Sequence, residues 1–228
     1  MLTNFYIFKK FDFISRKFFK NFEKMDLQNR NILERFIDMS TDDVKKHCLE
    51  HSLPYYNLAL NVVSDLNMGN MMRTSSLCGC RKFIIYGRRK FDKRSSVGSF
   101  NYIDYEQIAG GKPLKSHLDP YDFVIDPIQF KEYIISNNLL PIFIELTPNS
   151  KKVDNQILDE IFIVAKKIEK IPTFIYGSEH YGVPQNILEL EFPEVYYLKL
   201  NQAPPIQSFN VSNCLSIISY KIMELFTH

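Results

Sequence analysis

Three short polar segments hold the residues that could do chemistry, and each of them follows an apolar run. The segment 177–182 reads G-S-E-H-Y-G, with Glu179 between its two glycines. Because glycine has no Cβ and tolerates positive φ, such a pair lets the backbone approach a ligand closely. Ser208 and Asn210 stand where an apolar helical pattern begins, and a helix start offers free N–H groups. Together with N-M-G-N-M-M-R at 67–73, these segments predict strand ends that converge on one cleft.

The three segments together resemble the SpoU/TrmH branch of the SPOUT methyltransferases. The family's N-x-G-N-x-x-R, G-x-E-x-x-G and S-L-N motifs are matched, with Phe209 in place of the leucine, by Asn67, Gly69, Asn70, Arg73, Gly177, Glu179, Gly182, Ser208 and Asn210. The resemblance covers roughly residues 55–226. It implies methyl transfer from S-adenosylmethionine to a ribose 2′-hydroxyl of RNA. A tRNA substrate is expected rather than rRNA, since many rRNA-directed relatives have a further RNA-binding domain for which this chain has no room.

One stretch departs from the family pattern. The third motif usually begins I-P-M-x-G, whereas residues 200–204 here read L-N-Q-A-P. The eight-residue spacing from Leu200 to Ser208 is kept, so the resemblance still implies a cofactor loop. The change leaves a non-catalytic RNA-binding module open as one alternative. A methyltransferase that modifies a base nitrogen is another.

The resemblance assigns a role to each catalytic candidate. Arg73 would lie beside the methyl group, either as a general base or as a clamp on an RNA phosphate that orients the hydroxyl. The clamp demands less, because a guanidinium stays protonated with a pKa above about 12. Glu179 would orient Arg73 or shape the pocket, and Asn67 would hold its loop or contact the ribose. Ser208 and Asn210 would fix the cofactor loop.

The cofactor would lie against the backbone of three loops, each following a strand. The residues implied are Glu145, Leu146, Thr147, Gly177, Gly182, Leu198, Leu200 and Ser208. No G-x-G-x-x-G occurs, so a methyltransferase of the Rossmann type is not indicated. The resemblance also implies a C-terminal trefoil knot, formed by the last third of the chain, and a homodimer in which the partner subunit completes the cleft.

The distribution of charge is more informative than its sum, because the net charge of the 228-residue chain is only +2. Lysine and arginine dominate residues 81–94, where Asp92 is the single acid. Such a run would add salt-dependent, sequence-independent affinity for phosphates. The predicted RNA-binding residues are Arg88, Arg89, Lys90, Lys93 and Arg94, and a merely solvated basic loop is the alternative.

Cysteine usage and hydropathy bound the compartment. The four cysteines show neither C-x-x-C nor a disulfide framework, which favours reduced thiols and a cytoplasmic protein. No metal site is expected, because the histidines and cysteines lack zinc-site spacing. No apolar run reaches the roughly 18 residues of a membrane span. The basic, aromatic residues 1–24 could be a mitochondrial or plastid presequence, a docking helix, or the product of a start codon placed too early.

The remaining sequence must position these residues. Short apolar runs alternate with helical stretches, which predicts an α/β domain with a mainly parallel sheet flanked by helices. The expected strands are 57–63, 82–86, 122–125, 140–146, 173–176 and 195–200, and the expected helices are 69–79, 127–137, 155–169 and 208–226. A helical N-terminal extension over 1–54, with helices within 26–52 and Pro54 at its end, is expected to precede a methyltransferase domain over 55–228.

Overall fold

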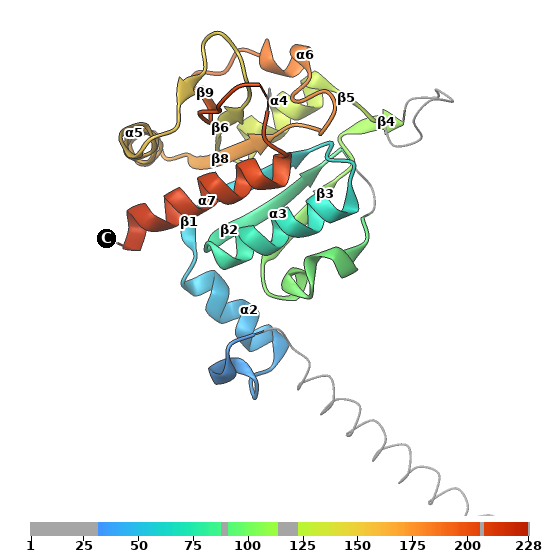
Figure 1. The fold of residues 1–228 in the computed structure, drawn as a ribbon, viewed down its shortest axis with the longest axis vertical. Helices are drawn as coiled ribbons and strands as arrows, with labels where there is room; N and C mark the ends of the chain where they lie inside the picture. Colours follow the sequence, from blue (N-terminus) through green and yellow to red (C-terminus); the bar gives the residue numbers. More distant parts are fainter. Residues whose placement is uncertain (1–31, 88–90, 114–122, 206–207, 228) are drawn as a thin grey trace, which may run out of the picture. The chain divides into compact units, whose positions relative to one another are not determined.

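The computed structural model describes residues 32–87, 91–113, 123–205 and 208–227 (Figure 1). The chain divides into two compact units between Val44 and Lys45. The extension expected over residues 26–52 includes one 3₁₀ turn, η1 (Glu34–Phe36), and one helix, α2 (Thr41–Glu50). Ser40 caps the start of this helix, because its Oγ accepts a hydrogen bond from Asp43 N at 3.1 Å.

The larger unit is built on a seven-stranded sheet in which every neighbouring pair is parallel. The strand order is β3-β2-β1-β8-β6-β9-β7. The strands are β1 (Leu53–Leu60), β2 (Cys80–Tyr86), β3 (Asp104–Ile108), β6 (Leu139–Ile144), β7 (Lys151–Lys152), β8 (Ile171–Tyr176) and β9 (Tyr196–Lys199). This confirms the expected α/β fold with a mainly parallel sheet, while the implied knot stays a prediction.

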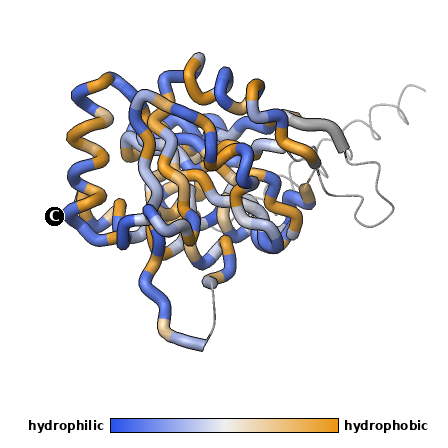
Figure 2. Tube along the Cα trace, turned by 90° about the horizontal axis from the view of Figure 1, so that it is seen from above, coloured by the Kyte–Doolittle hydropathy of each residue, from blue (hydrophilic) through white to orange (hydrophobic). Residues whose placement is uncertain are grey.

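Helices cover both faces of the sheet. One face carries α3 (Asp65–Leu77), α5 (Asn155–Lys167) and α7 (Val211–Thr227), and the other carries α4 (Pro127–Ser136) and α6 (Gln185–Leu188) (Figure 1). Alternation along the strands explains the two layers: on β1, Ala59 joins the first core, while Leu58 and Leu60 join the second. Along the helices, Figure 2 shows hydrophobic and hydrophilic stretches following one another. Among the described residues, no helix is long and apolar enough to cross a membrane.

Two expectations about element boundaries are wrong. The helix expected over 69–79 begins earlier, at Asp65, after the cap residue Ser64, whose Oγ accepts a hydrogen bond from Asn67 N at 3.4 Å. The N-x-G-N-x-x-R motif therefore lies inside the helix. Pro54, expected to end the extension, is the second residue of β1, where the early strand position tolerates proline. The strand expected at 122–125 exists as β5 (Phe123–Ile125), but it pairs antiparallel with β4 (Gly111–Pro113), outside the main sheet.

Candidate active site

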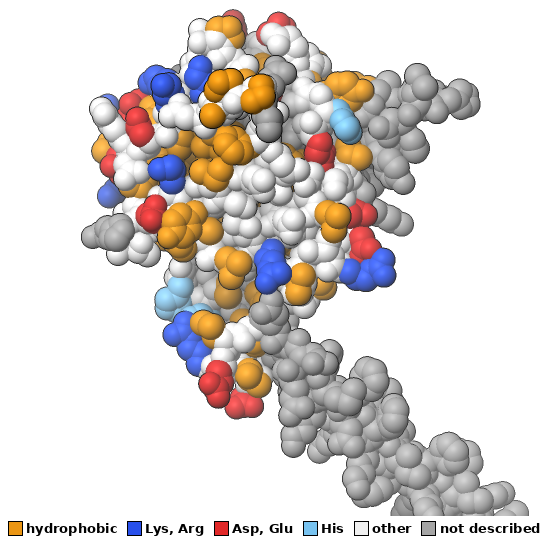
Figure 3. All heavy atoms as spheres, in the orientation of Figure 1, with side chains coloured by type: hydrophobic (Ala, Val, Ile, Leu, Met, Phe, Trp, Pro, Cys, Tyr) orange, Lys and Arg blue, Asp and Glu red, His pale blue; other side chains and the backbone are white. Residues whose placement is uncertain are grey.

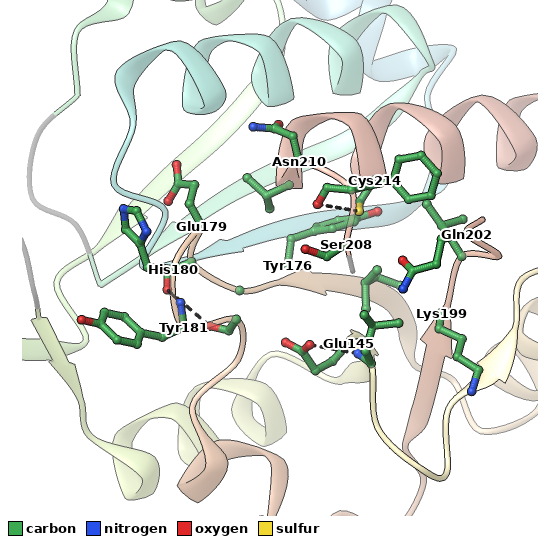
Figure 4. A pocket seen from close by; sticks show the side chains of 18 residues that line it. Glu145, Tyr176, Glu179, His180, Tyr181, Lys199, Gln202, Ser208, Asn210 and Cys214 are labelled. Carbon is green, nitrogen blue, oxygen red and sulfur yellow. Dashed lines mark hydrogen bonds between the residues drawn. The ribbon is translucent and has the colours of Figure 1, made fainter. Parts of the chain in front are cut away.

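A cavity of about 520 Å³ opens at the carboxyl ends of β6, β8 and β9 (Figure 4). Its wall comes from the loops that follow these strands, within 144–146, 176–182 and 199–202, and from 208–214 at the start of α7. Carboxyl ends of parallel strands are where open α/β sheets bind ligands. The volume lies within the range of small-molecule sites. The predicted convergence of polar segments on one cleft is therefore present for two of the three segments.

The loop 177–182 closes on itself. Ser178 N donates to Gly182 O and Gly182 N donates to Ser178 O, both at 3.0 Å. Gly182 has φ +64°, and a Cβ there would lie 2.3 Å from Glu145 Oε2. A Cβ at Gly177 would lie 2.0 Å from the Gly182 carbonyl carbon. Both motif glycines are thus required: Gly177 lets the two ends of the loop pack together, and Gly182 lets the loop pack against Glu145.

Glu179 ties this loop to the start of α3. Its carboxylate accepts from Val63 N and Ser64 N, both at 2.9 Å, and from Asn67 Nδ2 at 2.8 Å. Burial pushes the pKa of Glu179 up, but these hydrogen bonds outweigh it and hold the pKa below its ordinary value. The carboxylate is therefore ionised at neutral pH, where the helix start favours an anion.

Asn210 joins the third motif to the other two. Its Nδ2 donates to Asn67 Oδ1 at 3.1 Å, while its Oδ1 accepts from Ser212 N at 2.8 Å. The same residue accepts from Cys214 N through its backbone oxygen at 2.9 Å, so it caps α7. Glu179, Asn67 and Asn210, which are far apart in the sequence, form one chain of hydrogen bonds beside the cavity.

Arg73 is placed differently from the other catalytic candidates. It is half-buried on α3, six residues after Asn67, and it does not line the cavity. It makes no hydrogen bond or ion pair with another residue that the structure describes. The three hydrogen bonds of Glu179 all come from residues at the start of α3, and none comes from Arg73. Within one chain, the arginine and the cavity are therefore separate.

Most of the predicted cofactor residues line the cavity. Those that do are Glu145, Leu146, Gly177, Gly182, Leu200 and Ser208. Leu198 is instead fully buried in the core and offers only its backbone oxygen, which accepts from Glu145 N at 3.0 Å. Thr147 closes the turn after β6, with its Oγ1 2.8 Å from Ser150 Oγ. Leu198 and Thr147 therefore stabilise the loops and do not line the cavity.

The sequence motifs do not name several residues of the wall. Gln202 and Cys214 line it, as does Tyr176, whose hydroxyl is buried and has no partner among the described residues. Burial raises the pKa of the Cys214 thiol to about 11 and that of Tyr176 well above its ordinary value. The sequence could have indicated Cys214 as a cavity residue, because it lies one helical turn after Asn210. No group of His, Cys, Asp and Glu within the described ranges could hold a metal ion.

Of the predicted RNA-binding residues, the two that the structure describes, Lys93 and Arg94, already contact other residues of the protein. Arg88, Arg89 and Lys90 lie outside the described residues, while Lys93 and Arg94 belong to the 3₁₀ turn η2 (Lys93–Ser96). Arg94 binds the carboxylate of Asp92 with Nη2 at 2.5 Å from Oδ2, and this hydrogen bonding lowers the pKa of Asp92 to about 2. Lys93 Nζ lies 5.0 Å from the ring centroid of Phe100 and 5.4 Å from that of Tyr105.

Gly69 connects this segment to the helix that carries Arg73. A Cβ at Gly69 would lie 2.2 Å from Ser95 Oγ, so only glycine lets η2 pack this closely on α3. A second contact supports the first, since Asp92 N donates to Asp65 Oδ1 at 3.1 Å. The glycine of the first motif therefore fixes the basic segment on the motif helix.

Comparison with known proteins agrees with this arrangement at the level of the fold. No family model and no curated protein sequence matches the chain. The A. aeolicus TrmH/SpoU tRNA modifying enzyme superposes with a TM-score of 0.57 at 20% identity, over 81% of each chain. The SpoU methyltransferase AviRb from Streptomyces viridochromogenes, in complex with AdoMet, gives 0.55 at 16% identity, over 78% of this chain and 61% of that one.

A third solved structure, an RNA 2′-O ribose methyltransferase, gives a TM-score of 0.53 at 14% identity, over 78% of this chain and 58% of that one. The chain thus spans less than two thirds of the length of the last two proteins. The expected resemblance is confirmed in three dimensions: this chain has the fold of the SpoU/TrmH methyltransferases.

Proposed function

We propose that this protein is an S-adenosylmethionine-dependent RNA methyltransferase that modifies a ribose 2′-hydroxyl of tRNA. The observation that supports this best is the hydrogen-bond chain of Glu179, Asn67 and Asn210 beside a cavity of small-molecule size. It unites the three sequence motifs, and it does so in a fold shared with a tRNA modifying enzyme and a ribose 2′-O-methyltransferase.

The cavity suits the proposed cofactor. Ile144, Leu146 and Leu200 provide apolar surface, while the carboxylates of Glu145 and Glu179 line the same space. Glu145 is held by Val183 N at 2.8 Å and Leu146 N at 2.9 Å. S-adenosylmethionine would supply an activated methyl group on a positively charged sulfur, and two fixed carboxylates favour a cation in the cavity.

The proposed reaction needs no covalent bond between the protein and either substrate. In the reaction, a bond would form between the ribose oxygen and the methyl carbon, the carbon–sulfur bond would break to leave the neutral thioether S-adenosylhomocysteine, and the hydroxyl proton would pass to water. Arg73 is proposed as the clamp on an RNA phosphate that aims the hydroxyl, because the planar N–H donors of its guanidinium match phosphate oxygens and it has no anionic partner among the described residues. Orientation of this kind is a large contributor to catalysis.

A homodimer would explain why Arg73 stands apart from its own cavity. The outward face of α3 exposes Leu66 and Leu77, each 72% accessible, on either side of Arg73. The neighbouring α7 exposes Tyr220, and the two helices are joined by Thr74 and Ser216, whose hydroxyls lie 3.2 Å apart. Figure 3 shows this side of the molecule, where hydrophobic side chains gather in several places between scattered charged ones. A second copy on this face would receive Arg73 into its cavity.

Mixed dimers test this placement of Arg73. Arg73→Ala removes the clamp, and Ser208→Arg blocks the cavity at an exposed position that tolerates a large side chain. We expect each variant alone to lose at least about a hundredfold in turnover. Co-expressed with two different tags and purified as a mixed dimer, they would regain about half of the wild-type activity, from one complete site. An inactive mixed dimer would mean that Arg73 serves its own cavity.

The function itself is tested by methyl transfer from labelled S-adenosylmethionine to unmodified tRNA and rRNA transcripts, followed by digestion and separation of the nucleosides. Label in a 2′-O-methylnucleoside of tRNA is the expected result. Label in a modified base would replace the proposal with a base methyltransferase, and label confined to rRNA would correct the substrate. Cofactor binding with RNA binding but no transfer would favour the non-catalytic module.

A further inference from the structure

We propose that Tyr181, with His180 at the edge of its ring, is a stacking platform for an unpaired base of the RNA substrate. The inference rests on the proposed function, because it requires RNA at the cavity, and it names an unpaired segment as the part of the RNA that binds there. Neither ring belongs to a matched motif position, since both residues fall between Glu179 and Gly182.

Both rings lie at the mouth of the cavity. Tyr181 and His180 line it and are exposed, and Tyr181 is 73% accessible. Figure 4 shows them on the side of Glu179, extending away from Gln202 and Lys199. Their ring centroids are 6.3 Å apart and the ring planes meet at 67°, an edge contact that leaves most of the Tyr181 ring open to a ligand.

The loop holds the stacking platform in a fixed place. Tyr181 N donates to Ser178 Oγ at 3.3 Å, within the turn that the two backbone hydrogen bonds between Ser178 and Gly182 close. Glu179, the residue before His180, is bound to the start of α3. Because the backbone is held and a tyrosine side chain has only two rotatable angles, stacking on this ring would cost little conformational entropy.

The charges on this side of the cavity favour the base of a nucleotide over its phosphate. The ionised carboxylate of Glu179 is next to the two rings in the loop and would repel a phosphate. Among the described residues that line the cavity, Lys199 is the only lysine or arginine, and it lies on the other side (Figure 4). A base is uncharged, and any base can stack on a tyrosine or histidine ring.

Stacking on a protein ring restricts which bases can bind. A base inside a duplex is covered on both faces by its neighbours, so only an unpaired base can be splayed out onto an aromatic side chain. Glu179 connects through Asn67 to Asn210, so the stacking platform adjoins the motif residues where the reacting ribose is expected. The platform would therefore select an unpaired segment of RNA at the site of methylation.

The affinity of the full-length protein for two RNAs tests the inference, measured by fluorescence anisotropy with S-adenosylhomocysteine present. One probe is a set of unmodified tRNA transcripts, and the other is a fully paired RNA duplex of similar length. Tyr181→Ala should weaken tRNA binding about fivefold to a hundredfold, the effect of losing one stacked base, and leave duplex binding unchanged within about twofold. Tyr181→Phe keeps the ring and should stay within about twofold of the wild type for both RNAs.

Three further measurements separate stacking from other roles. Ile163→Ala removes a 68% accessible apolar side chain from α5, which does not line the cavity, and should bind both RNAs as the wild type does. Tyr181→Ala should keep the salt dependence of tRNA binding, because it loses no phosphate contact. Calorimetric titration with S-adenosylhomocysteine should give Tyr181→Ala the wild-type affinity within about twofold, since the ring lies at the mouth of the cavity.

The outcomes separate the two levels of the proposal. A Tyr181→Ala protein that binds the tRNA transcripts like the wild type, or that loses tRNA and duplex affinity equally, would overturn the stacking platform and leave the proposed function intact. So would a change in its oligomeric state, which would assign the ring to a contact between copies of the chain. A wild-type protein that binds neither S-adenosylhomocysteine nor RNA would overturn the proposed function, and the platform with it.

Discussion

The two loops that face each other across the cavity are built in opposite ways. The loop 177–182 closes on itself through two backbone hydrogen bonds, and Glu179 anchors it to α3 with three more. Residues 201–205 are all exposed, two of them are prolines without an N–H donor, and Asn201 and Ala203 make no hydrogen bond with other described residues. A loop fixed by specific contacts tolerates little change, whereas a loop with few contacts can diverge. The family pattern is accordingly intact in the first loop and altered in the second.

The largest effect should come from adding one carbon to the fixed loop. In Gly177→Ala the new Cβ would meet the Gly182 carbonyl carbon at 2.0 Å, and backbone cannot yield as a side-chain tip can. We expect a loss of about 1–3 kcal/mol of unfolding free energy and the loss of cofactor binding. Urea denaturation measures the unfolding free energy, and calorimetric titration measures cofactor binding. Gly98→Ala is the control for cofactor binding: its new Cβ meets nothing within 4 Å, while the φ of +83° strains an alanine there, so it should lose about 1–2 kcal/mol of unfolding free energy and keep cofactor binding. Normal binding by Gly177→Ala would show that the loop is not rigid.

A smaller, pH-dependent effect is expected at Glu179. Glu179→Gln removes the charge and leaves one of the N–H donors at the start of α3 without its acceptor, at a cost of about 1–3 kcal/mol at pH 7. The folded-state pKa of Glu179 is lowered, so its carboxylate stabilises the fold above the unfolded pKa of about 4.3. This stabilisation is lost as the pH falls through the folded pKa, and the two proteins should converge there.

The measurement is urea unfolding of both proteins at pH 7, 5 and 3.5. Glu191→Gln provides the control, since Glu191 is exposed and belongs to no described hydrogen bond. It should change the unfolding free energy by less than about 0.5 kcal/mol at every pH. A difference between wild type and Glu179→Gln that stays constant with pH would show that the charge of Glu179 does not act through the start of α3.

The smallest effect should come from the opposite loop. Asn201→Ala changes an exposed side chain without a described partner, so the unfolding free energy should move by less than about 0.5 kcal/mol. Urea denaturation checks this at pH 7. A cost above about 1 kcal/mol would remove the contrast between the two loops.

Much of the fold is predictable from apolar runs, and the exceptions are instructive. β3 goes unpredicted because D-Y-E-Q-I alternates with charged residues and lies at an edge of the sheet. Its acids have cationic partners: Lys82 Nζ lies 3.6 Å from Asp104 and 3.4 Å from Glu106, and Lys45 Nζ lies 3.8 Å from Asp104. β5 is predicted as a strand but not as the partner of β4, because local hydropathy does not specify which strand pairs with which.

The site is predictable as a set of residues, but its connections are not. The motifs name Glu179, Asn67 and Asn210, yet the partner of Glu179 depends on β1 and β8 being neighbours in the sheet. That adjacency brings the end of β8 to Ser64, where α3 begins. Leu198 was expected at the cofactor, but the alternation of β9 turns its side chain into the core. Contacts between distant segments follow from the topology, which no single motif encodes.

The adjacency of β1 and β8 also has a consequence for how the protein is made. Tyr56 pairs with Thr173, so the centre of the sheet joins segments separated by more than 100 residues. On the ribosome, β1 can pair early with β2, but its other edge has no strand to pair with until β8 emerges. At ordinary rates of translation this interval lasts on the order of ten seconds, during which an apolar strand edge is open to other chains. Nascent chains of this protein should therefore depend on chaperones at the stage between β2 and β8.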